Sequence, residues 1–253
     1  MKNIVPFILL FILIGACKPT KTYLADERVT YHRMKASDTL PNDPSVEKLI
    51  QPYRTKIEGS MNEVIGQSAQ ELTHIQPEGL MGNWAADMIH RQAEIYYGKK
   101  IDFTVLNHSG LRIRAIPKGN ITRSKMFELM PFENQITVLQ GDGATIEKLF
   151  QIIAAKGGWP ISHATLEIQP MPAGAIAKNI TIGGEPLQSD KIYTFTLPDY
   201  IANGGDNAPL TQLKRQDLNK LMRDAFIEGV LKDKADGKIS DAKLEGRTVI
   251  INN

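Results

Sequence analysis

Three loop segments carry the side chains of this chain that are best suited to recognising a small polar ligand. The first runs from Asn107 to Arg112, directly after an apolar stretch, and offers a side-chain amide and a planar guanidinium. An amide both donates and accepts hydrogen bonds, and a guanidinium pairs with carboxylate or phosphate oxygens. Taken alone, the segment also fits an ordinary surface turn that ends in an exposed arginine.

The second and third segments add aromatic rings. Phe132 follows a proline after a short predicted helix, and Tyr200 precedes the turn from Asn203 to Asp206. Each ring alone is as well explained by core packing, and the turn alone by a capping aspartate. Together, two rings with amide, guanidinium and carboxylate groups suit a nucleobase held between aromatic faces, with polar contacts to ribose and phosphate.

Other catalytic patterns are absent from the 253 residues. The histidines form no H-E-x-x-H or H-x-H pair, and no G-x-S-x-G or G-x-x-x-x-G-K-[ST] segment occurs. The segment Gly141-Asp142-Gly143 predicts a turn, because it is too short for a dinucleotide-binding pattern. His90 lies on a predicted helix without a ligand partner, so we expect it to be solvated or half-buried. The residues therefore indicate neither a nucleophile with its base nor a metal cluster.

Composition narrows the classes of protein further. The chain has 30 Lys and Arg against 28 Asp and Glu, without a long basic run, which disfavours nucleic-acid binding. Hydrophobic residues make up 42% and charged residues 23%, which is typical of a globular protein of one or two domains. The single cysteine excludes an intramolecular disulfide and a cysteine-rich zinc site.

The N-terminus indicates what that cysteine does. Lys2 precedes an almost unbroken apolar run from Ile4 to Ile14, and Gly15-Ala16-Cys17 follows. This is the layout of a secretory signal peptide, and the run is too short for a comfortable transmembrane span. The end of the run resembles a bacterial lipobox, in which the chain is cut before the cysteine and the thiol is lipidated. An ordinary signal peptide with a chance cysteine is the alternative.

These features predict three regions: a lipoprotein signal peptide over residues 1–16, a polar tether over 17–43 and one folded domain over 44–253. The tether has no helical or strand period, apart from one short strand expected near Val29–Tyr31. We expect a protein of the bacterial cell envelope, attached to a membrane by lipid on Cys17, at the periplasmic or outer-membrane face.

Helices and strands alternate irregularly along the folded part, which predicts an α+β domain with a mixed sheet and packed helices. The pair Gly183-Gly184 predicts a hairpin between the strands before and after it. The periodicity predicts helices over residues 45–62, with Ser45 as N-cap, 81–97, 124–130, 144–156 and 217–231. Strands are predicted over residues 64–72, 101–106, 135–140, 164–168, 176–182, 192–197 and 247–251.

The three loop segments, in this order and at this spacing, resemble the C-terminal, substrate-recognition domain of the 5'-nucleotidase / UDP-sugar hydrolase family. That family typically shows N-x-G-G-[IL]-R, then [LQM]-P-F-x-N, then an aromatic residue before a G-G-D turn. The stretch from Glu78 to Asn83, followed by Ala86-Asp87, resembles the family's helix opening. The resemblance runs from about Val64 to Ile251.

The resemblance implies roles for individual residues. The rings of Phe132 and Tyr200 would hold the nucleobase between them. Asn107 would bind the edge of the base or substrate, and Arg112 would contact ribose or phosphate oxygens. Asp206 would accept hydrogen bonds from the ribose hydroxyls, with Asn203 of the same turn as a further substrate-binding residue.

The sequence departs from the family pattern at several positions. Ser109 replaces a glycine, and Tyr200 replaces the commoner phenylalanine but keeps a stacking face. Ile75 and Gln76 stand where family members often carry arginines, which weakens the contacts expected on the phosphate side. The D-x-H and G-N-H-[DE] patterns of the family's metallophosphatase domain are also missing. The resemblance thus implies no cofactor and no catalytic residue in this chain, and two divalent metal ions in a separate metallophosphatase partner.

Three functions stay open on the sequence. The first is a nucleotide- or nucleoside-recognition domain of a 5'-nucleotidase-type phosphohydrolase that works with a separate metallophosphatase chain in nucleotide catabolism. The second is a non-catalytic envelope lipoprotein that binds nucleosides or nucleotides. The third is a structural envelope protein that keeps the fold without the site, against which the preserved recognition residues argue.

Overall fold

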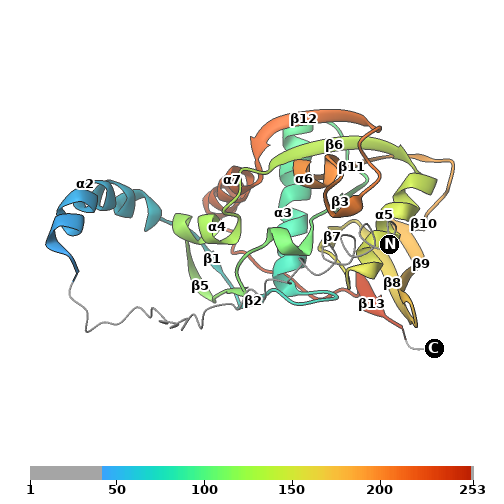
Figure 1. Cartoon of the computed structure of the whole chain (residues 1–253), viewed down its shortest axis with the longest axis horizontal. Helices are drawn as coiled ribbons and strands as arrows, with labels where there is room; N and C mark the ends of the chain where they lie inside the picture. The colour runs from blue at the N-terminus through green and yellow to red at the C-terminus, as the bar shows by residue number, and fades with distance from the viewer. Residues whose placement is uncertain (1–41, 252–253) are drawn as a thin grey trace, which may run out of the picture. The chain divides into compact units, whose positions relative to one another are not determined.

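The computed structural model describes residues 42–251 (Figure 1). The expected signal peptide, Cys17, most of the tether and the expected strand near Val29–Tyr31 lie outside the described residues. Within residues 42–251, no helix has both the length and the apolar character needed to cross a membrane.

Helix α2 (Pro44–Met61) includes the boundary between two compact units, which falls between Leu49 and Ile50. The expected N-cap, Ser45, is wrong by two positions. The Asp43 carboxylate accepts hydrogen bonds from the Ser45 amide at 2.8 Å and the Ser45 hydroxyl at 2.6 Å. Aspartate at this place satisfies a backbone donor that has no partner within the helix.

The second unit is built on two larger sheets. The five-stranded sheet has the order β12-β6-β11-β3-β7, and only the pair β11–β3 is parallel. Its strands are β3 (Phe103–Val105), β6 (Gln135–Asp142), β7 (Ile161–Ser162), β11 (Ile192–Pro198) and β12 (Lys214–Leu221). The four-stranded sheet, β10-β9-β8-β13, comprises β8 (Ala164–Met171), β9 (Gly174–Ile182), β10 (Glu185–Pro186) and β13 (Thr248–Ile250).

Smaller ribbons and the helices complete this unit. The two-stranded ribbons pair β1 (Val64–Ser68) with β5 (Gly119–Thr122), and β2 (Leu72–Thr73) with β4 (Ala115–Ile116). The helices are α3 (Leu80–Tyr97), α4 (Arg123–Leu129), α5 (Gly143–Ala155), α6 (Asp199–Ala202) and α7 (Met222–Ala235). Two short 3-10 turns are η1 (His108–Gly110) and η2 (Gly205–Asn207).

Helix α3 runs through the middle of this unit, with α7 on one side and β7 on the other (Figure 1). Two hydrophobic clusters result, one around α3 and α7 and one around α5 and the two larger sheets. In the second cluster the rings of Phe103 and Phe195 stack with centroids 4.9 Å apart and are fully buried. The predicted α+β class is confirmed.

Several predicted elements differ from the structure. The helix predicted over residues 217–231 begins only at Met222, because Lys214–Asp217 pair with strand β6 and the chain remains extended to Leu221. Pairing with a neighbouring strand overrides the local helical period here. The strand predicted over 64–72 is split into β1 and β2, and Gly183-Gly184 joins β9 to the short strand β10. Ile95, whose spacing from Met88 in the helix predicted over residues 81–97 favours the inner face, is instead 60% exposed.

Candidate functional site

The three predicted recognition segments meet at one cavity of about 280 Å³. Turn η1 supplies the first wall, the loop after α4 supplies the second, and the first residues of α6 supply the third. The lining consists of Asn107, Ser109, Gly110, Arg112, Phe132, Asn134 and Tyr200. Segments about 90 residues apart in the sequence therefore line a single cavity.

The two aromatic side chains of this cavity are half-exposed to solvent. Phe132 is 43% exposed and Tyr200 is 47% exposed. The Arg112 guanidinium lies 5.4 Å from the centroid of the Phe132 ring, in cation–π range. Gly205 backs Tyr200, because a Cβ atom at Gly205 would lie 2.6 Å from a carbon of the tyrosine ring. The exposed rings give a ligand two apolar faces, with a cation beside one of them.

The first loop is ordered by its own polar side chains. Asn107 is only 7% exposed, and its amide nitrogen donates to the Ser109 hydroxyl at 3.0 Å. Arg112 donates to the Ser109 carbonyl at 3.3 Å. A Cβ atom at Gly110 would lie 3.0 Å from the Asn107 Oδ1 atom, so glycine allows the loop to fold tightly over that amide. Asn107 thus both shapes the loop and lines the cavity.

Asn134 lines the cavity as well, although it was not among the residues predicted to bind substrate. Its Nδ2 atom donates to the Asp199 Oδ1 atom at 3.0 Å. The signal was present in the sequence, since Asn134 occupies the last position of the P-F-x-N segment that begins at Pro131.

Asn203 and Asp206 lie outside the cavity lining. The Asn203 side chain accepts a hydrogen bond from Arg215 at 2.5 Å. Asp206 has a left-handed backbone with φ of 55°, and its carboxylate lies 3.4 Å from the Lys156 ammonium. The structure therefore brings together four of the six predicted substrate-binding residues and places the other two in the adjoining turn.

The sequence of this chain is similar to those of known proteins. The family model described as "5'-nucleotidase, C-terminal domain" matches residues 61–215. The chain belongs to this family. A 5'-nucleotidase of Vibrio cholerae is 26% identical over 208 residues, which cover 79% of this chain and 36% of that protein. The chain thus spans about a third of the length of the curated relatives that it matches.

Solved structures share the fold. A 5'-nucleotidase precursor from Thermus thermophilus has a TM-score of 0.72 at 24% identity, over 84% of this chain and 44% of that one. A protein from the same organism, titled sulfate thiohydrolase SoxB, has a TM-score of 0.60 at 15% identity, over 84% of this chain and 40% of that one. Because a protein named 5'-nucleotidase and one named sulfate thiohydrolase share this fold, the fold alone does not determine a substrate.

The segment that resembles the family's helix opening has a structural role in this family member. The Glu78 carboxylate accepts hydrogen bonds from the Asn83 amide at 2.6 Å and from the backbone amides of Glu245 at 2.9 Å and Gly246 at 3.0 Å. These bonds fasten the segment before β13 to the start of α3.

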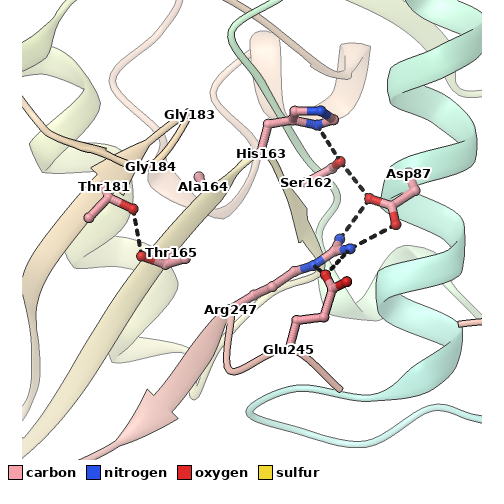
Figure 2. A pocket seen from close by; sticks show the side chains of 10 residues that line it. All are labelled: Asp87, Ser162, His163, Ala164, Thr165, Thr181, Gly183, Gly184, Glu245 and Arg247. Carbon is pink, nitrogen blue, oxygen red and sulfur yellow. Dashed lines mark hydrogen bonds and ion pairs between the residues drawn. The ribbon is translucent and has the colours of Figure 1, made fainter. Parts of the chain in front are cut away.

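A second cavity, of about 450 Å³, lies beside this attachment (Figure 2). Arg247 donates to both oxygens of Asp87 at 2.7 Å and to Glu245 at 2.6 Å, and the Ser162 hydroxyl donates to Asp87 at 2.6 Å. The ring of His163 points toward Ser162, whose oxygen lies 2.9 Å from the His163 Nδ1 atom. The polar groups of these side chains are hydrogen-bonded to one another. The network therefore links Arg247, directly before β13, to α3 and β7.

His90 differs from the prediction of a solvated or half-buried residue, because it is only 5% exposed. Its ring stacks on His163 with centroids 3.9 Å apart, and its Nδ1 atom lies 2.9 Å from the Thr104 hydroxyl. Burial, and then the neighbouring His163, lowers the pKa of His90 from 6.5 to about 4. Helical periodicity could not show that a second ring and a hydroxyl would enclose this side chain.

This histidine makes the stability of the domain dependent on pH. The pKa of His90 is lower in the folded than in the unfolded chain, so acidification protonates the unfolded chain first. The contribution of neutral His90 to the free energy of unfolding is therefore present above about pH 6.5 and decreases toward pH 4. We expect His90 to account for a loss of about 2 kcal/mol in the free energy of unfolding between about pH 7.5 and about pH 5. His74, whose pKa burial also lowers to about 4, acts in the same direction.

Urea unfolding at the two pH values tests this prediction, with His90→Gln as the comparison. Glutamine retains a polar group opposite Thr104 but does not titrate. The variant is expected to lose less stability on acidification than the wild type. An unchanged pH dependence in His90→Gln would contradict the role given to His90.

Proposed function

We propose that this domain recognises the nucleoside part of a nucleotide, with the base between Phe132 and Tyr200. The observation that carries the proposal is the convergence of two half-exposed rings, Arg112, Asn107 and Asn134 on one cavity. Aromatic faces suit any base, and the amides can pair with its edge. In this proposal Arg112 would contact ribose or phosphate oxygens, and Asp206 and Asn203 would approach the ribose from the adjoining turn.

We further propose that phosphoester hydrolysis depends on a separate metallophosphatase chain that supplies two divalent metal ions. Such a pair of ions generates the attacking hydroxide and neutralises the phosphate. Within residues 42–251, no group of three or more His, Cys, Asp or Glu side chains is placed to hold a metal. In this proposal the present chain binds and orients the nucleoside, while the partner docks so that its metals face Arg112.

The proposed location is the bacterial cell envelope, through a lipid on Cys17. Acyl chains contribute about 0.8 kcal/mol for each buried methylene, so several chains would anchor the protein firmly. Incorporation of labelled fatty acid into the wild type, with none in Cys17→Ser, would support the anchor. Equal labelling of both would contradict it.

Calorimetric titration of the purified protein with adenosine and AMP tests the recognition proposal. Saturable binding of both is expected, with no phosphate released from AMP in the presence of a divalent metal. Absence of binding would overturn nucleoside recognition, and robust phosphate release by the chain alone would overturn the need for a partner. Pull-down of a metallophosphatase, followed by a test for restored hydrolysis, examines the partner directly.

One observation favours the alternative of a binding protein without a catalytic partner. Among the residues that the structure describes, Arg112 is the only cationic side chain in the cavity lining. Gln76, which stands where family members often carry an arginine, donates its amide to the carbonyls of Lys156 at 2.8 Å and Gly158 at 2.7 Å. Phosphate contacts are therefore few. Adenosine binding as tight as AMP binding, together with no recovered metallophosphatase, would support this alternative.

A further inference from the structure

Asp199 connects two walls of the recognition cavity through a single oxygen atom. Its Oδ1 atom accepts a hydrogen bond from the Tyr200 backbone amide at 2.8 Å and another from the Asn134 Nδ2 atom at 3.0 Å. Asp199 opens helix α6, whereas Asn134 ends the loop that carries Phe132. The contact thus joins the segments that present the two rings.

The chemistry of this contact fixes the orientation of the Asn134 amide. A carboxylate only accepts hydrogen bonds, whereas an asparagine side chain has a donor end and an acceptor end. The nitrogen of Asn134 must therefore face Asp199, and its oxygen is directed elsewhere. The Asn134 backbone carbonyl accepts from the Met222 amide at 2.9 Å, which holds the residue at the end of its loop. Within residues 42–251, the Asn134 Oδ1 atom accepts no hydrogen bond.

We propose that Asp199 is a positioning residue that leaves the Asn134 carbonyl oxygen free for the ligand. The cavity then prefers a base that presents an N–H donor on the edge facing Asn134, such as the exocyclic amino group of adenine or cytosine. This inference rests on the proposed function, and it adds a preference among bases that stacking between Phe132 and Tyr200 does not provide.

The preference is measurable with nucleosides that differ by one amino group. We would titrate the protein with adenosine and with purine riboside, which lacks the 6-amino group, and with cytidine and its deaminated analogue pyrimidin-2-one riboside. Nucleosides are preferable to nucleotides, because removing the charge of Asp199 would also alter phosphate binding. One hydrogen bond corresponds to a preference of about tenfold for the amino-bearing member of at least one pair.

Asp199→Ser is the informative variant, because its single hydroxyl can accept from the Tyr200 amide while it either accepts from or donates to Asn134. Both orientations of Asn134 then become accessible, and we expect the preference to fall below about threefold. Asp199→Asn retains a carbonyl oxygen for the Tyr200 and Asn134 donors and should keep the preference. Asn134→Ala should remove the preference, and it serves if Asp199→Ser fails to fold.

Asp142→Ser is the matched control. Asp142 is also an aspartate before a helix, and its carboxylate accepts from the Thr145 amide at 2.8 Å, but it lies outside the cavity lining. This variant should keep the wild-type preference. Equal affinities of the wild type for both members of each pair would overturn the inference, as would an equal loss for both members in Asp199→Ser. Absence of binding of every nucleoside would overturn the proposed function itself.

Discussion

Replacing Tyr200 by alanine is expected to weaken adenosine binding by about 1–3 kcal/mol, which corresponds to roughly 5- to 150-fold in Kd. The side chain is 47% exposed at the cavity, so its ring is available to a base rather than fully used in core packing. Calorimetric titration measures the change. Tyr200→Phe keeps the stacking face and should bind almost as the wild type does.

A double-mutant cycle with Phe132→Ala distinguishes a shared base from two separate contacts. If both rings hold the same base, the two losses will not add, because one substitution alone frees the base to shift. Tyr53→Ala is the matched control, since Tyr53 is 67% exposed and lies outside the cavity lining. Unchanged adenosine affinity in both Tyr200→Ala and Phe132→Ala would contradict the stacking assignment.

The sequence was sufficient to predict which segments form the site but not every side chain that lines it. Asn107, Arg112, Phe132 and Tyr200, which line the cavity, were predicted from the resemblance of their segments to the family's motifs, whereas each segment taken alone also fitted a surface turn or core packing. The role of Asp199 was not predictable, because it depends on a hydrogen bond to a residue 65 positions earlier. The pairing of Asp206 with Lys156 is likewise a contact between distant segments, which local patterns do not encode.

Prediction of the fold was limited in the same way, by contacts between segments that lie far apart in the sequence. Most helices and strands were predicted because their apolar periods are long and regular, and the α+β class followed from their irregular order. Residues 217–221 were predicted as helix because their apolar spacing resembles that of the true helix after Met222. Their extended conformation comes from β6, a strand predicted separately but without its partner. Sequence patterns indicated the elements, whereas strand pairing decided this boundary.

Replacing Arg247 by methionine is expected to lower the free energy of unfolding by about 3 kcal/mol, because Asp87 would lose its partner for two hydrogen bonds. The Arg247 side chain is 12% exposed, and it also donates to the Ile161 carbonyl at 2.9 Å. Asp87 is 47% exposed, so water would compensate part of the lost interaction with Arg247. The expected decrease in stability therefore lies near the lower end of the range for breaking a buried ion pair. Urea unfolding gives the change, and hydrogen exchange should show reduced protection in β13.

The control and the double variant decide between a structural and a ligand-binding role for the cavity in Figure 2. Lys220→Met removes an ion pair to Glu228 whose side chains are 43% and 48% exposed, and should change stability by less than about 1 kcal/mol. Adding Asp87→Asn to Arg247→Met should recover part of the stability, since an unpaired carboxylate is removed. If Arg247 were instead held for a ligand, its removal would cost little stability and the second substitution would recover nothing. Adenosine affinity should stay unchanged in each folded variant, because none of the three substituted residues lines the recognition cavity.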